Sequence, residues 1–305
     1  MIRVAAMDCG TNSLRLLVAD VDAGTGVLRD VERRMEIVRL GEGVDRTGRI
    51  APGAMARTLA ATERYAKVCA DLGVQRIRYV ATSATRDADN RAEFVAGVQG
   101  LLGVPPEVVS GDEEARLSFD GATRGLPGGH PAPYLVVDIG GGSTEFVLGE
   151  PGTVLAARSV DIGCVRLTER YSGPDRDRTG AADAPAGSGA VAPELAGAEA
   201  AVLADVDAAL ARAAESVDLS RAATLIGLAG SVTTITAHAL GLPRYDSAAI
   251  HGSVLPVAEA VAACTDLAAM GREERLALPD LLPGRADVIG AGALRVAGGD
   301  RAGGR

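Results

Sequence analysis

Apolar residues recur along the 305-residue chain with two periods, the alternation typical of half-buried β-strands and the wider spacing typical of amphipathic helices. Up to position 126 this pattern predicts strands at 2–8, 13–21, 27–40, 77–82 and 108–110, and helices at 52–72, 91–102 and 113–125. Beyond it, the pattern predicts strands at 134–138, 143–148, 154–160 and 224–228, and helices at 193–215, 231–240, 257–269 and 285–296. Strands and helices that alternate in this way predict an α/β protein.

Three segments depart from these periods. Residues 172–192 consist mainly of Gly, Ala, Pro, Asp and Arg, a composition that predicts a flexible surface loop. Residues 298–305 predict a frayed tail. Residues 222–242 carry no full charge over about the length of a membrane span, but glycines and hydroxyl residues interrupt them. We therefore expect a buried strand, a glycine turn and a helix there.

The most informative feature is an internal repeat. The segment from Asp8 to Arg15 aligns with the segment from Asp138 to Glu145, with Asp, Gly and Ser at the same offsets. Each copy joins two predicted strands. A duplicated hairpin predicts a duplicated domain, here residues 1–126 and 127–305, with a cleft between the halves and with room for the last helix to pack back on the first domain.

Each copy of the repeat ends a strand with an acid and then presents glycine and hydroxyl residues. Glycine lets the backbone turn tightly and approach a ligand, and successive backbone N–H groups with hydroxyls bind anions. A third glycine turn, at 227–234, precedes a helix whose N-terminus also suits a phosphate. One such turn is commonly structural, whereas three in one chain predict phosphate binding. The candidate phosphate-binding residues at the turns are Gly10, Thr11, Asn12, Ser13, Arg15, Gly140, Gly141, Gly142, Ser143, Thr144, Gly230, Ser231 and Thr233.

Charged residues near the turns add further candidates. An acid at neutral pH does not bind phosphate directly, but it can hold Mg²⁺, or Mn²⁺ in its place, and the metal then bridges to phosphate oxygens. Asp8, Asp138 and Glu145 are candidate metal ligands on this ground, with a solvated strand position as the alternative for Glu145. Arg86 follows a predicted strand, where it can clamp a phosphate or be an ordinary surface arginine. Glu114 lies in the first turn of a predicted helix. The helix dipole favours acidic residues at this position, so its presence there needs no catalytic explanation.

Composition excludes several classes of protein. The net charge of −9 argues against a protein that coats nucleic acid, and it confines any attraction for a polyanion to a few arginines, backbone amides and a metal. Lys67 is the only lysine, and no P-loop sequence is present. The four cysteines form no C-x-x-C pair and the three histidines have no metal spacing, which favours reduced thiols, a cytoplasmic location and no zinc site. We expect no association with membranes.

Seven segments, in the same order and over nearly the whole chain, resemble the exopolyphosphatase/guanosine pentaphosphatase family: residues 8–16, 81–86, 110–117, 138–145, 162–169, 227–234 and 282–287. The resemblance implies the duplicated actin-like (ribonuclease H-like) ATPase superfold. It also implies that Glu114 is the catalytic general base, which deprotonates a water in line with the terminal phosphorus. Asp138 and Glu145 match the metal-associated pair, and Arg86 matches a position that lines the phosphate channel together with residues of the turns.

The activity implied by this resemblance is the Mg²⁺-dependent release of orthophosphate from inorganic polyphosphate. Short chains are the expected preference, because the chain is expected to lack the additional C-terminal helical domains of longer members. Hydrolysis of the alarmone pppGpp to ppGpp is the nearest alternative, and either nucleotide could also bind as an inhibitor. A non-catalytic polyphosphate or alarmone sensor and an actin-like ATPase or sugar kinase are further alternatives, against which Glu114 and the Arg86 segment argue. The predicted helical surfaces are compatible with a homodimer.

Overall fold

The computed structural model describes residues 1–126, 128–171 and 198–293, which form two compact units that divide between Gly111 and Asp112. The sequence placed this boundary after residue 126. The difference lies in one helix, α5 (Gly111–Arg124), whose buried Ala115 and Phe119 pack on the sheet of the second unit. The loop predicted at 172–192 and the tail at 298–305 lie outside the described residues. The cleft between the halves and the packing of the last helix on the first domain stay predictions.

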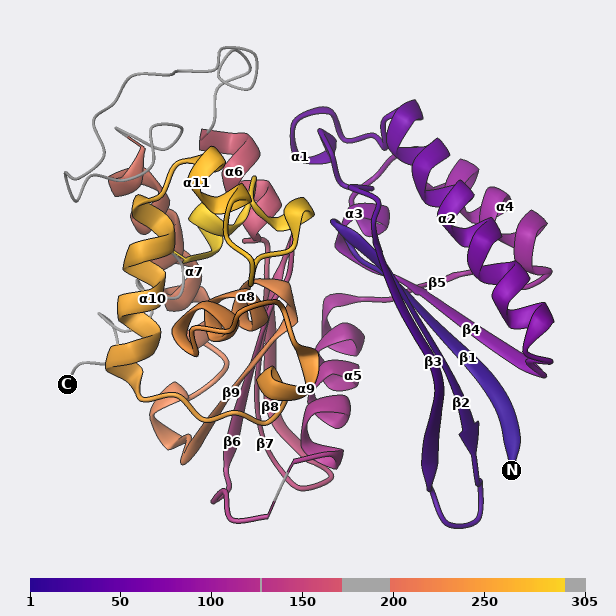
Figure 1. Cartoon of the computed structure of the whole chain (residues 1–305), viewed down its shortest axis with the longest axis horizontal. Coiled ribbons are helices and arrows are strands. Elements are labelled where there is room, and N and C mark those ends of the chain that lie inside the picture. Colours follow the sequence, from indigo (N-terminus) through magenta and orange to yellow (C-terminus); the bar gives the residue numbers. More distant parts are fainter. Residues whose placement is uncertain (127, 172–197, 294–305) are drawn as a thin grey trace. The chain divides into compact units, whose positions relative to one another are not determined.

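The first unit is built on one mixed sheet. Its elements in chain order are β1 (Ile2–Cys9), β2 (Ser13–Val21), β3 (Leu28–Ile37), α1 (Val44–Thr47), α2 (Pro52–Asp71), β4 (Arg76–Ala81), α3 (Ser83–Arg86), α4 (Arg91–Leu102) and β5 (Glu107–Val108). The strand order is β3-β2-β1-β4-β5, and Figure 1 shows α2 and α4 along one face. β1, β2 and β3 are antiparallel neighbours, whereas β4 runs parallel to both β1 and β5.

Helix α2 supplies much of the first core. It begins at Pro52, whose missing N–H costs nothing at the first turn of a helix. Tyr65 and Cys69 on this helix are buried against Leu14 and Leu16 of β2 and against Phe94 of α4. The core therefore fixes the sheet at the strand ends where the first glycine turn lies.

The second unit repeats this plan. Its elements are α5, β6 (Tyr134–Ile139), β7 (Thr144–Glu150), β8 (Thr153–Val160), α6 (Cys164–Tyr171), α7 (Glu199–Ala214), η1 (Leu219–Arg221), β9 (Thr224–Leu228), α8 (Ala229–Ala239), α9 (Ser247–Ile250), α10 (Val257–Ala269), α11 (Arg272–Leu276) and η2 (Pro283–Arg285), followed by helical residues 289–293. The strand order is β8-β7-β6-β9, with β6–β7 and β7–β8 antiparallel and β6–β9 parallel. Because β6 to β9 reproduce the pairing of β1 to β4, the predicted duplicated actin-like α/β fold is confirmed.

Helices cover both faces of the second sheet (Figure 1). On one face, Ala115 and Phe119 of α5 pack against Tyr134, Val136 and Val147. On the other face, α7, α8 and α10 pack against the residues that alternate with these along the strands, with a core that includes Leu135, Phe146, Leu148, Val206, Ile235 and Leu267. Since side chains alternate between the two faces along a strand, the residues two positions away from Val136 and Val147 must also face α5.

Most predicted elements are present, and the differences are local. β3 ends at Ile37 rather than at 40, because the N–H groups of Val38 and Arg39 donate instead to the carbonyl of Asn12 at 3.0 and 2.9 Å. Helix α6 and the short helices α1, α3, α9 and α11 were not predicted. Four of these five helices have four or five residues, too few to show a period.

In the described part of the chain, no helix combines the length and the apolar character needed to cross a bilayer.

Candidate functional site

The β6–β7 hairpin places two acidic side chains opposite each other. Asp138 near the end of β6 pairs in register with Glu145 near the start of β7. Directly opposite residues of an antiparallel pair project from the same face of the sheet. That face is the one covered by α5, because Val136 and Val147 lie two residues away along the same strands. Strand register alone thus brings the two candidate metal ligands together.

Helix α5 adds a third carboxylate, that of Glu114, which immediately precedes the buried Ala115. Glu145 is only 1% exposed. Its burial, followed by the negative charges of Glu114 and Asp138, raises the pKa of its carboxyl well above the ordinary value of 4.5, although hydrogen bonds from Ser143 and Ser159 act in the opposite direction. Glu114, the candidate general base, and the candidate metal pair therefore belong to one electrostatic site in the second unit.

Two serines outside the predicted motifs hold the hairpin carboxylates. Ser118, four residues after Glu114 on α5, donates its hydroxyl to Asp138 Oδ2 at 2.5 Å. Ser159, opposite Glu145 in the β7–β8 register, donates to Glu145 Oε1 at 2.8 Å. Helical spacing from Glu114 could have indicated Ser118, but the contact of Ser159 depends on the β7–β8 register, which shifts between Leu148 and Gly149.

The glycine turn between these strands, residues 140–143, is held from one side by the start of α6. The carbonyls of the turn accept hydrogen bonds from Cys164 N–H (to Gly140, 3.1 Å), from Val165 and Arg166 N–H (to Gly141, 3.0 and 3.1 Å) and from Arg166 Nε (to Gly142, 2.8 Å). In a trans peptide the N–H points opposite to the carbonyl of the preceding residue. The N–H groups of Gly141, Gly142 and Ser143 therefore point away from α6, where successive backbone donors suit an anion.

Thr144, the residue that follows the turn, makes a contact within the protein. Thr144 is buried, and its hydroxyl donates to the carbonyl of Ile162 at 2.7 Å. This bond ties the start of β7 to the segment that leads into α6, so Thr144 supports the turn from within the protein. Direct phosphate binding by Thr144 stays a prediction.

The third glycine turn lies at the same edge of the sheet as the second. Leu228 at the end of β9 is in parallel register with Asp138, and Ala229 then turns the chain with a positive φ of 69°. The hydroxyls of Thr233 and Thr234 donate back to the carbonyl of Gly230 at 3.3 and 2.8 Å. The start of α8 thus lies at the sheet edge where β6 and its carboxylate also end, and its N-terminus suits an anion.

A buried arginine that we did not predict as a site residue packs on this turn. A Cβ built on Gly230 would lie 2.0 Å from Arg285 Cζ, so only glycine lets the guanidinium come so close. Arg285 is 7% exposed. The sequence offered one signal, since residues 282–287 are among the segments that carry the family resemblance, but no local pattern linked them to Gly230.

The first unit builds its own turn in the same way. The carbonyl of Thr11 accepts from Gly41 N–H at 2.8 Å, and that of Asn12 accepts from the two residues that follow β3. The N–H groups of Asn12 and Ser13 therefore point away from segment 38–41. Asn12 Nδ2 is buried, and within the described residues it has no hydrogen-bond partner, which makes it a donor suited to a phosphate oxygen.

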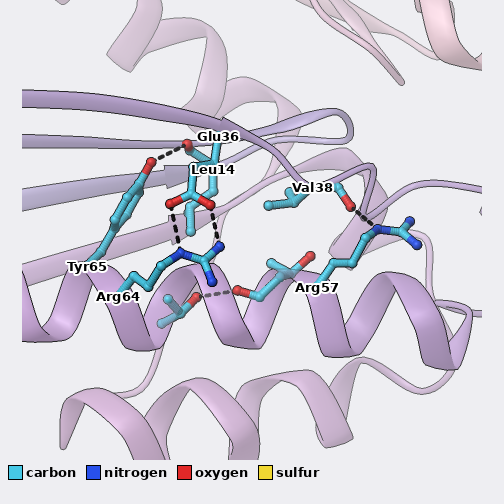
Figure 2. Close-up of polar contacts among 8 residues, drawn as sticks. Leu14, Glu36, Val38, Arg57, Arg64 and Tyr65 are labelled. Atoms are coloured by element: carbon cyan, nitrogen blue, oxygen red, sulfur yellow. Dashed lines mark hydrogen bonds and ion pairs between the residues drawn. The ribbon is translucent and has the colours of Figure 1, made fainter. Parts of the chain in front are cut away.

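Polar contacts of α2 support segment 38–41 and the adjoining strands (Figure 2). Arg57 Nε donates to the carbonyl of Val38 at 3.1 Å, and Tyr65 donates to the carbonyl of Leu14 at 3.3 Å. Arg64 Nε donates to Glu36 Oε1 of β3 at 3.2 Å, and Arg64 Nη2 donates to Oε2 of the same carboxylate. The turn at 10–13 therefore rests on a scaffold fixed by the helix.

The charged candidates of the first unit lie at this same strand edge. Asp8 is opposite Arg15 in the β1–β2 register, with Arg15 Nη1 3.7 Å from Asp8 Oδ2. Arg86 ends α3, directly after β4, and its Nη1 donates to the carbonyl of Val109 at 2.9 Å. The metal role of Asp8 and the phosphate roles of Arg15 and Arg86 stay predictions.

A model of the Ppx/GppA phosphatase family matches residues 17–297. The chain belongs to this family. It is 48% identical over 303 residues to Exopolyphosphatase 2 of Mycobacterium tuberculosis. The aligned region covers 97% of this chain and 89% of that protein. The crystal structure of an exopolyphosphatase-like protein superposes with a TM-score of 0.86 at 40% identity, over 97% of this chain and 88% of the other. A Ppx/GppA family member from Aquifex aeolicus gives a TM-score of 0.73 at 28% identity, over 97% and 89% of the two chains.

The site residues of this Ppx/GppA phosphatase fit a hard divalent cation. Among the described residues, no group of three or more His, Cys, Asp and Glu side chains forms a preorganised metal cage. Mg²⁺ does not need one, since it is commonly held by one or two carboxylates together with waters and substrate phosphates. Asp138 and Glu145 offer oxygen ligands, and the pKa of Glu145, which is raised first by burial and then by the charges of Glu114 and Asp138, is one that a bound cation would lower.

Replacing Glu145 by glutamine is expected to stabilise the metal-free protein at neutral pH. Because its pKa is raised in the folded state, the favourable contribution of protonated Glu145 is complete below 4.5 and is lost as the pH rises through the folded pKa. Thermal unfolding in a chelator between about pH 4 and about pH 9 should show the wild-type midpoint falling relative to that of Glu145→Gln. Added Mg²⁺ should raise the wild-type midpoint more than that of the variant. Parallel curves for the two proteins would contradict this account of Glu145.

Proposed function

We propose that this protein is an exopolyphosphatase, a phosphatase that hydrolyses the terminal phosphoanhydride bond of inorganic polyphosphate and releases orthophosphate. The observation that carries the proposal is the convergence of Glu114, Asp138 and Glu145 beside a glycine turn whose N–H groups point away from α6. A general base, an acidic pair suited to a metal and an anion nest are the parts that phosphoryl transfer to water requires. The 48% identity to Exopolyphosphatase 2 supports polyphosphate as the substrate.

In the proposed reaction Glu114 accepts a proton from the attacking water. The water oxygen forms a bond to the terminal phosphorus, the bond to the bridging oxygen breaks, and the shortened chain leaves with that electron pair. The N–H groups of Gly141, Gly142 and Ser143 hold the oxygens of the reacting phosphate and stabilise the charge that develops on them. Gly230 and Ser231, at the start of α8, extend the anion site along the same sheet edge.

We propose Mg²⁺ as the cofactor, with Mn²⁺ as a substitute, and Asp138 and Glu145 as the protein ligands. When bound, the cation would neutralise charge on the phosphate oxygens. What this chain supplies is the acidic pair, fixed by the hairpin register and by two serine hydroxyls. These contacts favour an ion with a preference for oxygen ligands.

Short polyphosphates are the proposed preferred substrates, for an electrostatic reason. The chain carries a net charge of −9, so attraction for a polyanion must be local, while repulsion by the rest of the protein grows with polymer length. Salt screens this long-range repulsion more than it screens contacts within a buried site. The preference for short chains should therefore weaken as the ionic strength rises.

The deciding experiment measures phosphate release with Mg²⁺ from short polyphosphate, long polyphosphate, pppGpp and ATP in parallel. We expect release from both polyphosphates, with a ratio of short-chain to long-chain rates that falls from low to high salt. Release from pppGpp alone would move the assignment to the alarmone, and turnover of ATP alone would move it to an ATPase. Tight binding of a polyphosphate or an alarmone without release would identify a sensor and would overturn the catalytic proposal.

We also infer a cytoplasmic location, because Cys9, Cys69, Cys164 and Cys264 are buried free thiols, as expected in a reducing compartment. A homodimer is the proposed solution state, and inhibition by pppGpp or ppGpp is a proposed form of regulation. Sedimentation velocity and competition with the two nucleotides in the phosphate-release assay test these inferences.

A further inference from the structure

Ser118 occupies a position that links Glu114, the candidate general base, to the candidate metal pair. It lies four residues after Glu114 on α5, and residues at this spacing lie on the same face of a helix. Ala115 and Phe119, each one residue further along, form the buried face of α5 against the sheet. Glu114 and Ser118 therefore line the border of that buried face, where the helix meets the β6–β7 hairpin.

The hydroxyl of Ser118 forms a direct side-chain hydrogen bond between this stripe and the hairpin. It donates to Asp138 Oδ2 at 2.5 Å, across a separation of 20 residues in sequence. A hydrogen bond to a carboxylate restricts rotation of that group and uses one lone pair of Oδ2, so that the remaining lone pairs of Asp138 keep a fixed direction for a cation. On the other side of the pair, Ser159 makes the corresponding bond to Glu145.

The bond also opposes a repulsion that the site cannot avoid. Beyond the effect of burial, which is the largest, the negative charges of Glu114 and Asp138 both raise the pKa of the Glu145 carboxyl. Like charges at this junction tend to drive α5 away from the hairpin. A hydroxyl donor one helical turn from Glu114 instead attracts α5 to Asp138.

From this geometry we propose that Ser118 is a positioning residue, which orients Asp138 for the metal and sets the place of Glu114 relative to the carboxylate pair. The proposal rests on the metal role of Asp138 within the proposed function. Partners that orient metal-ligating carboxylates commonly change metal affinity or activity by about 10- to 100-fold when they are removed. Ser118→Ala should therefore weaken metal binding, although Ser118 itself contacts neither metal nor substrate.

The test measures Mn²⁺ binding to the full-length protein without substrate, by electron paramagnetic resonance of the free ion. Ser118→Ala is expected to lower the affinity for Mn²⁺ by about tenfold or more, and Ser118→Thr, which keeps the hydroxyl, should retain affinity close to that of the wild type. Thr123→Ala is the matched control, because the Thr123 hydroxyl on the same helix donates within α5, to the carbonyl of Phe119 at 2.8 Å. Wild-type affinity in Ser118→Ala would overturn the proposal.

A second measurement separates positioning from a loss of general stability. In an Asp138→Asn background, Ser118→Ala should produce no further loss of Mn²⁺ affinity, because the two residues act as one unit. An additive loss would overturn the proposal by showing that Ser118 acts elsewhere. If Ser118→Ala fails to fold, Ser118→Cys, which keeps the volume but donates weakly, replaces it in both tests.

The outcome is also distinguishable from that of the proposed function. If the wild type releases phosphate from polyphosphate and Ser118→Ala binds Mn²⁺ normally, only the role of Ser118 fails. If the wild type releases no phosphate from polyphosphate but Mn²⁺ binding depends on Ser118, the positioning role stands and the substrate assignment fails.

Discussion

Glu114→Gln is expected to reduce the turnover of polyphosphate by about 10²- to 10⁴-fold, the range typical of a lost general base. Glutamine keeps the size and hydrogen-bonding shape of the side chain but cannot accept the proton of the attacking water. Because Glu114 repels Glu145, its neutralisation should leave the metal site intact and should lower the pKa of the Glu145 carboxyl towards its ordinary value. We therefore expect kcat to fall while KM for polyphosphate and affinity for Mn²⁺ change little.

Glu113→Gln is the matched control for this variant. Glu113 is the neighbouring acid in the first turn of α5, it is exposed where Glu114 is partly buried, and it makes the same contribution to the helix dipole. Near-normal kinetics of Glu113→Gln beside a deep loss in Glu114→Gln would show that position, and not the charge of the helix terminus, matters. Near-normal turnover of Glu114→Gln would remove this residue from the role of general base.

The part of the site that was predictable from the residues is the part that local geometry decides. Asp138 and Glu145 flank one tight turn, so the register of a single hairpin makes them neighbours. The internal repeat predicted a second hairpin of the same kind, and the sheet orders of the two units confirm that duplication. Short-range strand pairing is specified by sequence within a few residues, which is why this inference needed no tertiary information.

The association of Glu114 with that pair is not local, and the residues alone did not predict it. An acid in the first turn of a helix has an ordinary explanation, and the domain boundary that we predicted placed α5 in the first half of the chain. Only the family resemblance pointed to Glu114. What assigns α5 to the second unit is the packing of Phe119 on Val136 and Val147, a contact between segments whose apolar patterns fit several partners.

The supporting residues were missed for the same reason. Ser118 and Arg285 act on elements that are distant in sequence, whereas Ser159 lies on the next strand, where a register shift between Leu148 and Gly149 hides its pairing with Glu145. Helix α6 has only eight residues, and its first N–H groups bond to the glycine turn, so its role depends on a tertiary contact rather than on its own periodicity. Positions that carry out such a role become evident only when the fold brings them together.

The importance of that contact leads to the second large expected effect, which concerns Gly163. A Cβ at this position would lie 2.0 Å from the carbonyl oxygen of Gly141 and 2.4 Å from the nitrogen of Gly142. Both are backbone atoms, so no side-chain rotation relieves the overlap, and either the turn or the start of α6 must move. Gly163→Ala should therefore destabilise the protein by about 1–3 kcal/mol or more. Displacement of the anion nest should also lower phosphate release by about 10²-fold in the molecules that remain folded.

Gly121→Ala is the control that isolates this steric cause. Gly121 lies in α5 of the same unit, a Cβ there has no heavy atom within 4 Å, and alanine in a helix interior should stabilise the protein by about 0.5–1 kcal/mol. Urea unfolding gives the stability of both variants, and phosphate release is then compared at a temperature where each is fully folded. A Gly163→Ala protein that is less stable and, where it is fully folded, still slow would show that the contact with α6 aims the N–H groups of the turn. If Gly163→Ala instead has the stability and the rate of phosphate release of the wild type, α6 does not set the geometry of the turn. The direction of the N–H groups of the turn then cannot be attributed to this packing.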